Sequence, residues 1–131
     1  MGDRGNIAIV HGKKEQVWLY SHWGGSDLPN RLKKGLDAGR GRWNDDSYLT
    51  KIIIGHVVPP DNWKEETGYG ISTRLQDNEH EILVVDIPNQ RVFTIEEEEL
   101  ENFKVPDGYV PDESKQWSFE KYSSLSKTPA T

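Results

Sequence analysis

The run from Glu81 to Asp86 places Ile, Leu, Val and Val in succession between two carboxylates. A strand that is apolar at consecutive positions is buried on both faces, unlike a strand that alternates between apolar and polar residues. Residues 87–90 (Ile-Pro-Asn-Gln) are typical of a turn, and residues 91–95 (Arg-Val-Phe-Thr-Ile) follow as an antiparallel partner. The chain is therefore expected to fold around a sheet that contains this strand.

The remaining patterns predict an α+β fold. Residues 6–10 and 16–20 form a predicted hairpin, and residues 68–73 form a further predicted strand. Two helices are predicted between them, one with an apolar stripe and one that Pro59-Pro60 ends. The stripe of the first helix consists of Leu28, Leu32 and Leu36, and the second helix is expected to place Tyr48, Leu49, Ile52 and Ile53 on one face.

The expected architecture is an antiparallel sheet of about five strands in the order β-β-α-α-β-β-β, with both helices packed on one face. The aromatic residues of the segment Trp117 to Tyr122 can dock a short C-terminal helix on the sheet. The length fits a single domain over residues 1–122. Residues 123–131 are rich in Ser, Thr, Lys and Pro, which predicts a disordered tail.

Composition narrows the class of protein. The chain has no cysteine, which excludes disulfides, zinc–thiolate sites and thiol catalysis. Its first residues carry no apolar signal segment, and no apolar run approaches the 18–20 residues or so that a membrane helix needs. We therefore expect a cytoplasmic protein with no membrane partner.

The charges are distributed unevenly along the chain. Residues 1–64 hold ten Lys/Arg and seven Asp/Glu, whereas residues 65–131 hold six and fifteen. The overall acidity argues against a general nucleic-acid binder, which usually presents a basic face. Residues 31–42 nevertheless carry five positive charges and one negative charge, a local patch that would attract a phosphate-bearing molecule.

The segment Ser21-His22-Trp23-Gly24-Gly25 lies where a predicted strand leads into a helix. Backbone N–H groups at a helix N-terminus carry partial positive charge, and two glycines before them allow an anion to approach closely. His22 adds a donor, and Trp23 offers a surface for stacking on a base or sugar. The alternative is an ordinary tight turn with Trp23 in the core.

The second candidate segment is Gly39-Arg40-Gly41-Arg42-Trp43. The guanidinium groups of Arg40 and Arg42 suit phosphate or carboxylate, and Trp43 or Tyr48 can stack on a ligand. The alternative is a solvated loop between helices with two surface arginines. Spacing does not decide whether this segment and the His22 segment share one site.

Catalytic signatures are weak in this chain. Neither serine candidate, Ser21 or Ser47, lies in a nucleophile elbow, and the glycines match neither a phosphate loop nor a dinucleotide fingerprint. The acidic turn at residues 77–80, with Glu81 and Asp86, fits a solvated turn better than a metal loop. We assign no catalytic residue, metal or cofactor, and a hydrolase or phosphodiesterase that depends on His22 remains an alternative.

Four segments together resemble a family of small uncharacterised bacteriophage and prophage proteins. They are residues 4–7 (Arg-Gly-Asn-Ile), the Leu-Tyr-Ser-His-Trp-Gly-Gly run ending at Gly25, the Gly39–Trp43 loop, and residues 68–72 (Gly-Tyr-Gly-Ile-Ser). The resemblance covers about residues 4–95 and brings no assigned activity. It implies a phage anti-defence protein in the host cytosol, which would sequester a host immune signalling nucleotide without cleaving it.

The ligand class that follows is a small nucleotide-derived anion, such as a cyclic nucleotide or an ADP-ribose derivative. The alternative partner is a host protein. The acidic second half, with its run Glu96 to Glu101, predicts an inhibitor that docks on such a protein through its acidic surface. The role of that run, the oligomeric state and the identity of the ligand all stay open, homo-oligomer formation included.

Overall fold

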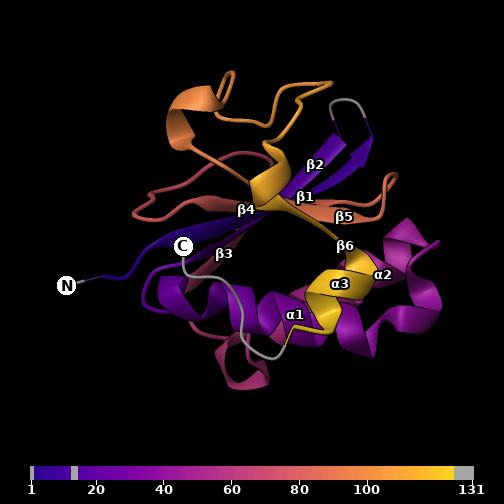
Figure 1. The fold of residues 1–131 in the computed structure, drawn as a ribbon. Helices are drawn as coiled ribbons and strands as arrows, with labels where there is room; N and C mark the ends of the chain where they lie inside the picture. Colours follow the sequence, from indigo (N-terminus) through magenta and orange to yellow (C-terminus); the bar gives the residue numbers. More distant parts are fainter. Residues whose placement is uncertain (1, 13–14, 126–131) are drawn as a thin grey trace.

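A computed structural model describes residues 2–12 and 15–125 of the chain. Its centre is a six-stranded sheet in the order β3-β2-β1-β4-β5-β6 (Figure 1). The strands are β1 (Gly5–Gly12), β2 (Glu15–Ser21), β3 (Tyr69–Ser72), β4 (Ile82–Asp86), β5 (Arg91–Ile95) and β6 (Gln116–Ser118). All five residues of β4 are buried, which confirms the strand predicted from its apolar run.

The sheet is mixed, so the prediction of about five strands that are all antiparallel was wrong in detail. β4 pairs with β1 in parallel, whereas the other four pairings are antiparallel. The cause lies just before β4, where the amide of Glu79 donates to the carbonyl of Arg4 at 2.9 Å. The chain thus returns to the amino end of β1 and has to run alongside it in the same direction.

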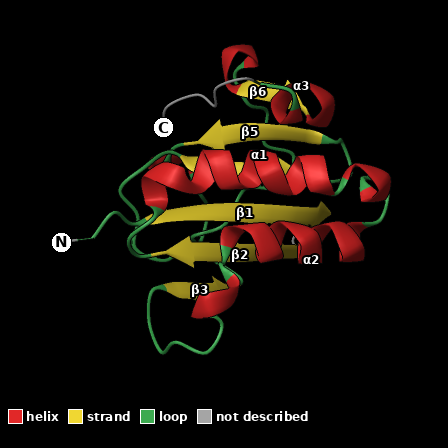
Figure 2. Ribbon diagram, turned by 90° about the horizontal axis from the view of Figure 1, so that it is seen from below, coloured by secondary structure: helices red, strands yellow, loops and turns green. Residues whose placement is uncertain are grey.

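Two helices cover one face of the sheet (Figure 2). α1 (Leu28–Ala38) runs along the strands over the centre of the sheet, and α2 (Asp46–Val57) lies over the β2 side. The predicted leucine stripe of α1 is buried, as are Leu49 and Ile53 of α2. Tyr48 is instead 53% exposed, because it lies about 100° around the helix from Leu49. The short helix α3 (Phe119–Ser123) packs on the same face through Phe119 and Tyr122.

Among the described residues, no long helix lies over the opposite face. Its apolar side chains, which include Ala8, Trp18, Val84 and Phe93, are covered by the segment 96–115, which lies above the sheet in Figure 1. We call this segment the acidic cover, because it carries eight carboxylates and two lysines. It includes the short 3-10 turns η4 (Glu97–Glu99) and η5 (Glu113–Lys115).

The C-terminal end of the described chain belongs to the folded body. α3 ends at Ser123, and Leu125 packs against the core beneath the helices. The tail that the sequence predicts to be disordered spans residues 123–131, and its part from residue 126 onward lies outside the described residues.

Candidate functional site

The His22 segment forms the exit of β2. Here β2 ends at Ser21 and the 3-10 turn η1 (Gly25–Asp27) leads directly into α1. The Gly24 amide donates to the Ser21 hydroxyl at 2.9 Å, and the Gly25 amide donates to the Asp3 carbonyl at 2.7 Å. The two amides of the predicted anion cradle therefore already have partners within the chain.

An internal carboxylate occupies this turn. Oδ2 of Asp3 accepts from the Ser26 amide at 2.9 Å and from the Ser26 hydroxyl, and Oδ1 contacts Nε2 of His80. These bonds, the Ser26 hydroxyl first among them, lower the pKa of Asp3 to about 2. The donors of Ser26 are thus already bonded to a carboxylate of the chain itself, and the Gly24 and Gly25 amides do not contact that carboxylate.

His22 and Trp23 lie beside this turn. The Tyr20 hydroxyl lies 2.8 Å from Nδ1 of His22, and burial raises the pKa of Tyr20, so the phenol stays protonated at neutral pH. The contact occupies Nδ1, and Nε2 of His22 has no hydrogen-bond partner among the described residues. Trp23 is 58% exposed and packs edge-on to His22, so it is not a core residue.

Arg40 and Trp43 are committed to contacts within the protein. The Arg40 guanidinium forms ion pairs with Asp37 at 2.7 Å and Glu120 at 2.6 Å, and it also donates to Ser123 at 2.8 Å. The Trp43 indole donates to the Leu36 carbonyl at 3.0 Å. Arg40 thus joins the end of α1 to α3, and the Trp43 ring packs edge-on to Phe119 of α3.

The side chains of Arg42 and Tyr48 are exposed and available to a ligand. The Arg42 guanidinium lies 4.9 Å from the centre of the Tyr48 ring, and its one ion-pair partner among the described residues is Asp45, at 3.9 Å. More than half of each side chain is exposed. An ideal Cβ at Gly41 would meet no atom within 4 Å, so the backbone beside Arg42 is open to solvent. We call Arg42, Tyr48 and Gly41 the Arg42 corner.

The two predicted segments lie at opposite ends of α1. This helix has 11 residues, which corresponds to a length of about 16 Å. His22 and Trp23 are at its start, whereas the Arg42 corner follows its end. Within one chain a small ligand therefore meets one segment or the other.

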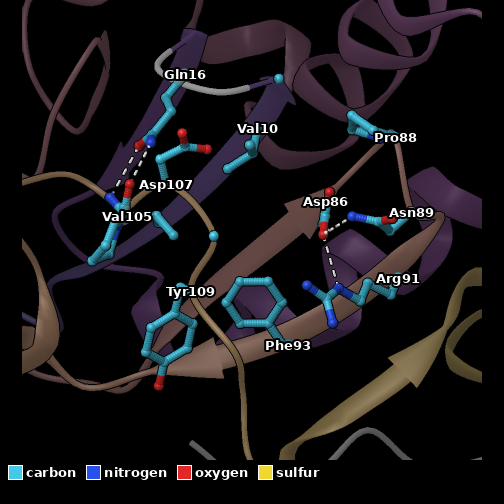
Figure 3. A pocket seen from close by; sticks show the side chains of 13 residues that line it. Val10, Gln16, Asp86, Pro88, Asn89, Arg91, Phe93, Val105, Asp107 and Tyr109 are labelled. Atoms are coloured by element: carbon cyan, nitrogen blue, oxygen red, sulfur yellow. Dashed lines mark hydrogen bonds and ion pairs between the residues drawn. The ribbon is translucent and has the colours of Figure 1, made fainter.

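A pocket that the sequence analysis missed lies on the face opposite the helices, beside the carboxyl ends of β1 and β4 (Figure 3). Its volume is about 240 Å³. Asp86 and Arg91 form one wall, Gln16 and Asp107 lie across from them, and the rings of Phe93 and Tyr109 close the lower side of the view. We call it the Asp86 pocket. The one signal that could have indicated it is a carboxylate that directly ends a fully apolar strand.

A further histidine, His11, has partners distant in sequence. His11 lies 2.9 Å from the Thr50 hydroxyl and 3.5 Å from the Asp46 carboxylate, an arrangement that superficially matches nucleophile, base and acid. However, Thr50 is 92% buried, and its hydroxyl also lies 2.7 Å from the Asp46 carbonyl, the ordinary acceptor of a helical threonine. This contact links the end of β1 to α2.

The described residues hold no group of three or more His, Asp or Glu side chains that could hold a metal ion. The acidic turn at residues 77–80 instead packs on the N-terminal segment: Arg4 pairs with Glu79 at 3.2 Å and with Asp77 at 3.4 Å. Among the helices of the described chain, none is long and apolar enough to cross a membrane.

Comparisons of the chain with protein-family models, with curated proteins and with solved structures found no match.

Proposed function

We propose that this protein binds a small anionic, nucleotide-derived molecule at the Arg42 corner and does not cleave it. The observation that carries the proposal is the exposed Arg42 guanidinium, stacked 4.9 Å from the Tyr48 ring and restrained by one long ion pair. A planar guanidinium recognises phosphate through two parallel hydrogen bonds. An exposed aromatic ring beside it can stack on a base.

The contrast with Arg40 supports the choice of Arg42. Arg40 has carboxylate and hydroxyl partners on α1 and α3 at 2.6–2.8 Å, so a ligand would have to displace them. Arg42 has one partner at 3.9 Å, a distance too long for a direct hydrogen bond. Of the two predicted phosphate clamps, Arg42 is therefore the better candidate.

Binding without cleavage is the preferred form of the proposal. Nδ1 of His22 contacts the Tyr20 hydroxyl, and no described serine or threonine hydroxyl is hydrogen-bonded to the His22 ring. Near the Asp3 turn, Ser26 and His80 both contact Asp3 and not one another. A catalytic triad needs the histidine between the carboxylate and the serine hydroxyl, and here the carboxylate lies between the other two. These contacts disfavour the His22 hydrolase alternative.

The resemblance to phage proteins motivates a more specific form of the proposal. A phage protein that binds a signalling nucleotide without cleaving it would lower the free concentration of a host immune signal. Cyclic nucleotides and ADP-ribose derivatives combine phosphates with bases, the two chemistries that Arg42 and Tyr48 can bind.

The test is calorimetric titration of the full chain with ADP-ribose, AMP and cyclic dinucleotides. Loss of one charge-assisted contact is worth about 1.5–3 kcal/mol, so Arg42→Ala is expected to weaken binding by about tenfold or more. Arg74→Ala is the matched control, because Arg74 is an exposed arginine that lies over a different ring, that of Phe103. Equal affinity in Arg42→Ala and the parent would refute the proposal, as would the absence of binding. Chromatography of the recovered ligand separates binding from hydrolysis.

The acidic cover supports a second candidate function, docking on a basic surface of a host protein. Its eight carboxylates and two lysines account for the whole net charge of −6, so the rest of the chain is neutral on balance. Charge complementarity of this kind makes association depend strongly on salt. The combined substitution of Glu96–Glu99 by Gln is expected to weaken capture of such a partner, and unchanged capture would eliminate this candidate.

A further inference from the structure

We propose that the Asp86 pocket binds the hydrogen-bonding edge of a small, uncharged, planar heterocycle of the nucleobase type. The contacts are a guanidinium nitrogen of Arg91, which donates to the heterocycle, and a carboxylate oxygen of Asp86, which accepts from it. No residue of this pocket belongs to the sites predicted from the sequence.

The pocket has the position that ligands favour in sheets with parallel strands. β1 and β4 are the parallel pair, with Val10 opposite Asp86 at their carboxyl ends. Side chains and turns that follow such ends converge around a crevice in open α/β sheets. In this protein the turn after β4 contributes Asn89, and the strand after that turn contributes Arg91.

Asp86 and Arg91 form a fixed pair before any ligand arrives. Oδ2 of Asp86 accepts from Nε of Arg91 at 2.8 Å and from Nδ2 of Asn89 at 2.9 Å, and Asp86 is 93% buried. On the other side of the guanidinium, Nη1 donates to Gln116 at 3.3 Å. The pair is therefore held from both sides in one orientation.

Two polar atoms of this pair are left over. Oδ1 of Asp86 and Nη2 of Arg91 have no hydrogen-bond partner among the described residues. Both atoms are accessible to solvent. The one side-chain atom of the described chain that is both fully buried and without a partner is Oγ1 of Thr94. The guanidinium extends from the pocket wall toward the Phe93 ring (Figure 3). Both atoms are thus available to a ligand.

These two atoms indicate what the ligand must offer. Nη2 donates and Oδ1 accepts, so a complementary ligand carries both an acceptor and an N–H donor, as the pairing edges of nucleobases do. The charges of Asp86 and Arg91 neutralise one another, and Asp107 adds a negative charge on the opposite wall, so the pocket disfavours a free anion. The rings of Phe93 and Tyr109, whose centres are 5.6 Å apart, add an apolar wall suited to a flat molecule.

The size of the pocket agrees with this class. A volume of about 240 Å³ corresponds to about eight water molecules at roughly 30 Å³ each. Pockets for drug-sized ligands begin at about 300 Å³, so this one suits a single base better than a whole dinucleotide.

The inference deepens the proposed function, because a nucleotide carries both a base and a phosphate. The Arg42 corner and the pocket lie at the same end of the molecule, since Asn44 of the α1–α2 loop accepts from Gln90 of the β4–β5 turn at 2.6 Å. The two sites are tested separately, as nucleosides have a base and no phosphate.

The experiment is a titration of the ¹⁵N-labelled full chain with adenosine, cytidine, guanosine and uridine, followed by amide NMR. At least one nucleoside is expected to shift the signals of Gly12, Asn89 and Gly108, which line the pocket, with saturation at millimolar concentration. Its counterpart without the N–H donor, N6,N6-dimethyladenosine or N3-methyluridine for example, is expected to bind about tenfold more weakly, because Oδ1 of Asp86 loses its partner.

Arg91→Lys keeps the positive charge and removes Nη2, the nitrogen that donates to the ligand, so it is expected to weaken nucleoside binding by about tenfold. Arg74→Lys, the same exchange outside the pocket, is expected to bind like the parent. Absence of saturable shifts with all four nucleosides would overturn the inference, and so would equal binding of the methylated counterparts. The methylated ligands keep the test decisive if Arg91→Lys does not fold. If ADP-ribose binds and no nucleoside does, the proposal for the Arg42 corner stands and the proposal for the Asp86 pocket is wrong.

Discussion

Gly25 lies where the chain leaving β2 meets the N-terminal segment. A Cβ on this residue would lie 2.6 Å from the carbonyl oxygen of Asp3 and 2.8 Å from the His80 ring. The first of these atoms belongs to the backbone and cannot move without shifting the chain. At Gly24 the nearest atoms, of Ser21 and Arg31, belong to side chains and start at 3.0 Å.

The two adjacent glycines are therefore expected to respond differently to alanine. Gly25→Ala should lower the free energy of unfolding by about 1–3 kcal/mol or more, because overpacked sites force backbone shifts. Gly24→Ala should lower it by less. Urea unfolding followed by tryptophan fluorescence measures both, with Gly41→Ala as a control at an open position. An equal loss at Gly24 and Gly25 would contradict the assigned close approach.

Asp3 is expected to make the free energy of unfolding depend on pH in the acidic range. Its pKa is about 2 in the folded protein and about 3.8 in an unperturbed carboxyl. A lowered folded-state pKa stabilises the protein above the unfolded-state value, and this stabilisation is lost as the pH falls through the folded-state value. The loss is therefore expected between about pH 4 and pH 2. Because a third of the side chain is exposed, its size is about 1 kcal/mol after solvent screening.

The variant that tests this is Asp3→Asn, which keeps an acceptor for the Ser26 amide and removes the charge. Its free energy of unfolding at pH 7 should be lower than that of the parent, and the difference should shrink between pH 4 and pH 2. Denaturant titrations at pH 7, 4, 3 and 2 provide the comparison. A constant difference over that range would exclude a role for the ionised carboxylate.

The glycines show how far residue-scale reasoning from sequence extends. Two adjacent glycines before a helix correctly predicted a close backbone approach, which Gly25 makes. The carboxylate at this turn, that of Asp3, was not predicted because it lies 23 residues from Ser26 and makes contact through the fold. The same limit applies to Arg40, whose partner Glu120 is 80 residues away. Sequence spacing identifies a donor and does not reveal whether the fold has already paired it.

At the scale of elements, α3 depends on Arg40 for its docking. This helix has five residues, too few to be stable without tertiary contacts. Arg40 reaches it through Glu120 and Ser123, while Phe119 and Tyr122 are buried beneath it. Burial raises the pKa of Tyr122 far above its usual value, so that phenol stays neutral.

Removal of Arg40 is therefore expected to loosen α3 selectively. In Arg40→Ala the amides of Ser124 and Leu125, which donate within the last turn, should exchange with solvent faster than in the parent. Arg42→Ala, which removes the same charge two residues away, should leave their exchange unchanged. Hydrogen exchange measured by NMR gives both rates. Equal acceleration in the two variants would point to a general charge effect instead.

The elements were largely predictable, as were the two antiparallel pairings of strands adjacent in sequence, β1 with β2 and β4 with β5, whereas the parallel pairing was not. Local periodicity identified α1, α2 and the first five strands, because burial of one face leaves a pattern in the sequence. The parallel pairing of β1 with β4 depends on the contact between Glu79 and Arg4, which no local pattern encodes. β6 has three residues, and it is a strand only because it lies against β5.

Across the whole molecule, the charge is separated between two faces. The helical face holds the Arg42 corner, and the opposite face holds the acidic cover, which accounts for the whole net charge. Gln16 of β2 holds the cover against the sheet. Its Oε1 accepts from the Val105 amide at 3.1 Å, and its Nε2 donates to the Val105 carbonyl at 2.8 Å. Such a fixed, like-charged layer repels itself, and its repulsion should weaken as salt is added.

Glu96 and Glu81 concentrate this repulsion at one edge of the cover. A hydrogen bond between the two carboxyls, followed by partial burial, raises the pKa of Glu96. For a carboxyl, a raised folded-state pKa means that the folded protein is more stable when the group is protonated. The sign is therefore opposite to that of Asp3: stability is lost as the pH rises past the usual carboxyl value.

Glu96→Gln is consequently expected to stabilise the protein at pH 7, by about 0.5 kcal/mol or less because nearly half of the side chain is exposed. The gain should shrink when salt is raised and should vanish below the usual carboxyl pKa, where Glu96 in the parent is already protonated. Glu113→Gln removes the same charge from the cover outside this pair, so it measures the contribution of net charge alone. Denaturant titrations at pH 7 and pH 3, in low and high salt, separate the two variants. If Glu96→Gln is less stable than Glu113→Gln at pH 7, the ion pairs of Lys115 with Glu81 and Glu96 dominate this edge, and carboxylate repulsion does not.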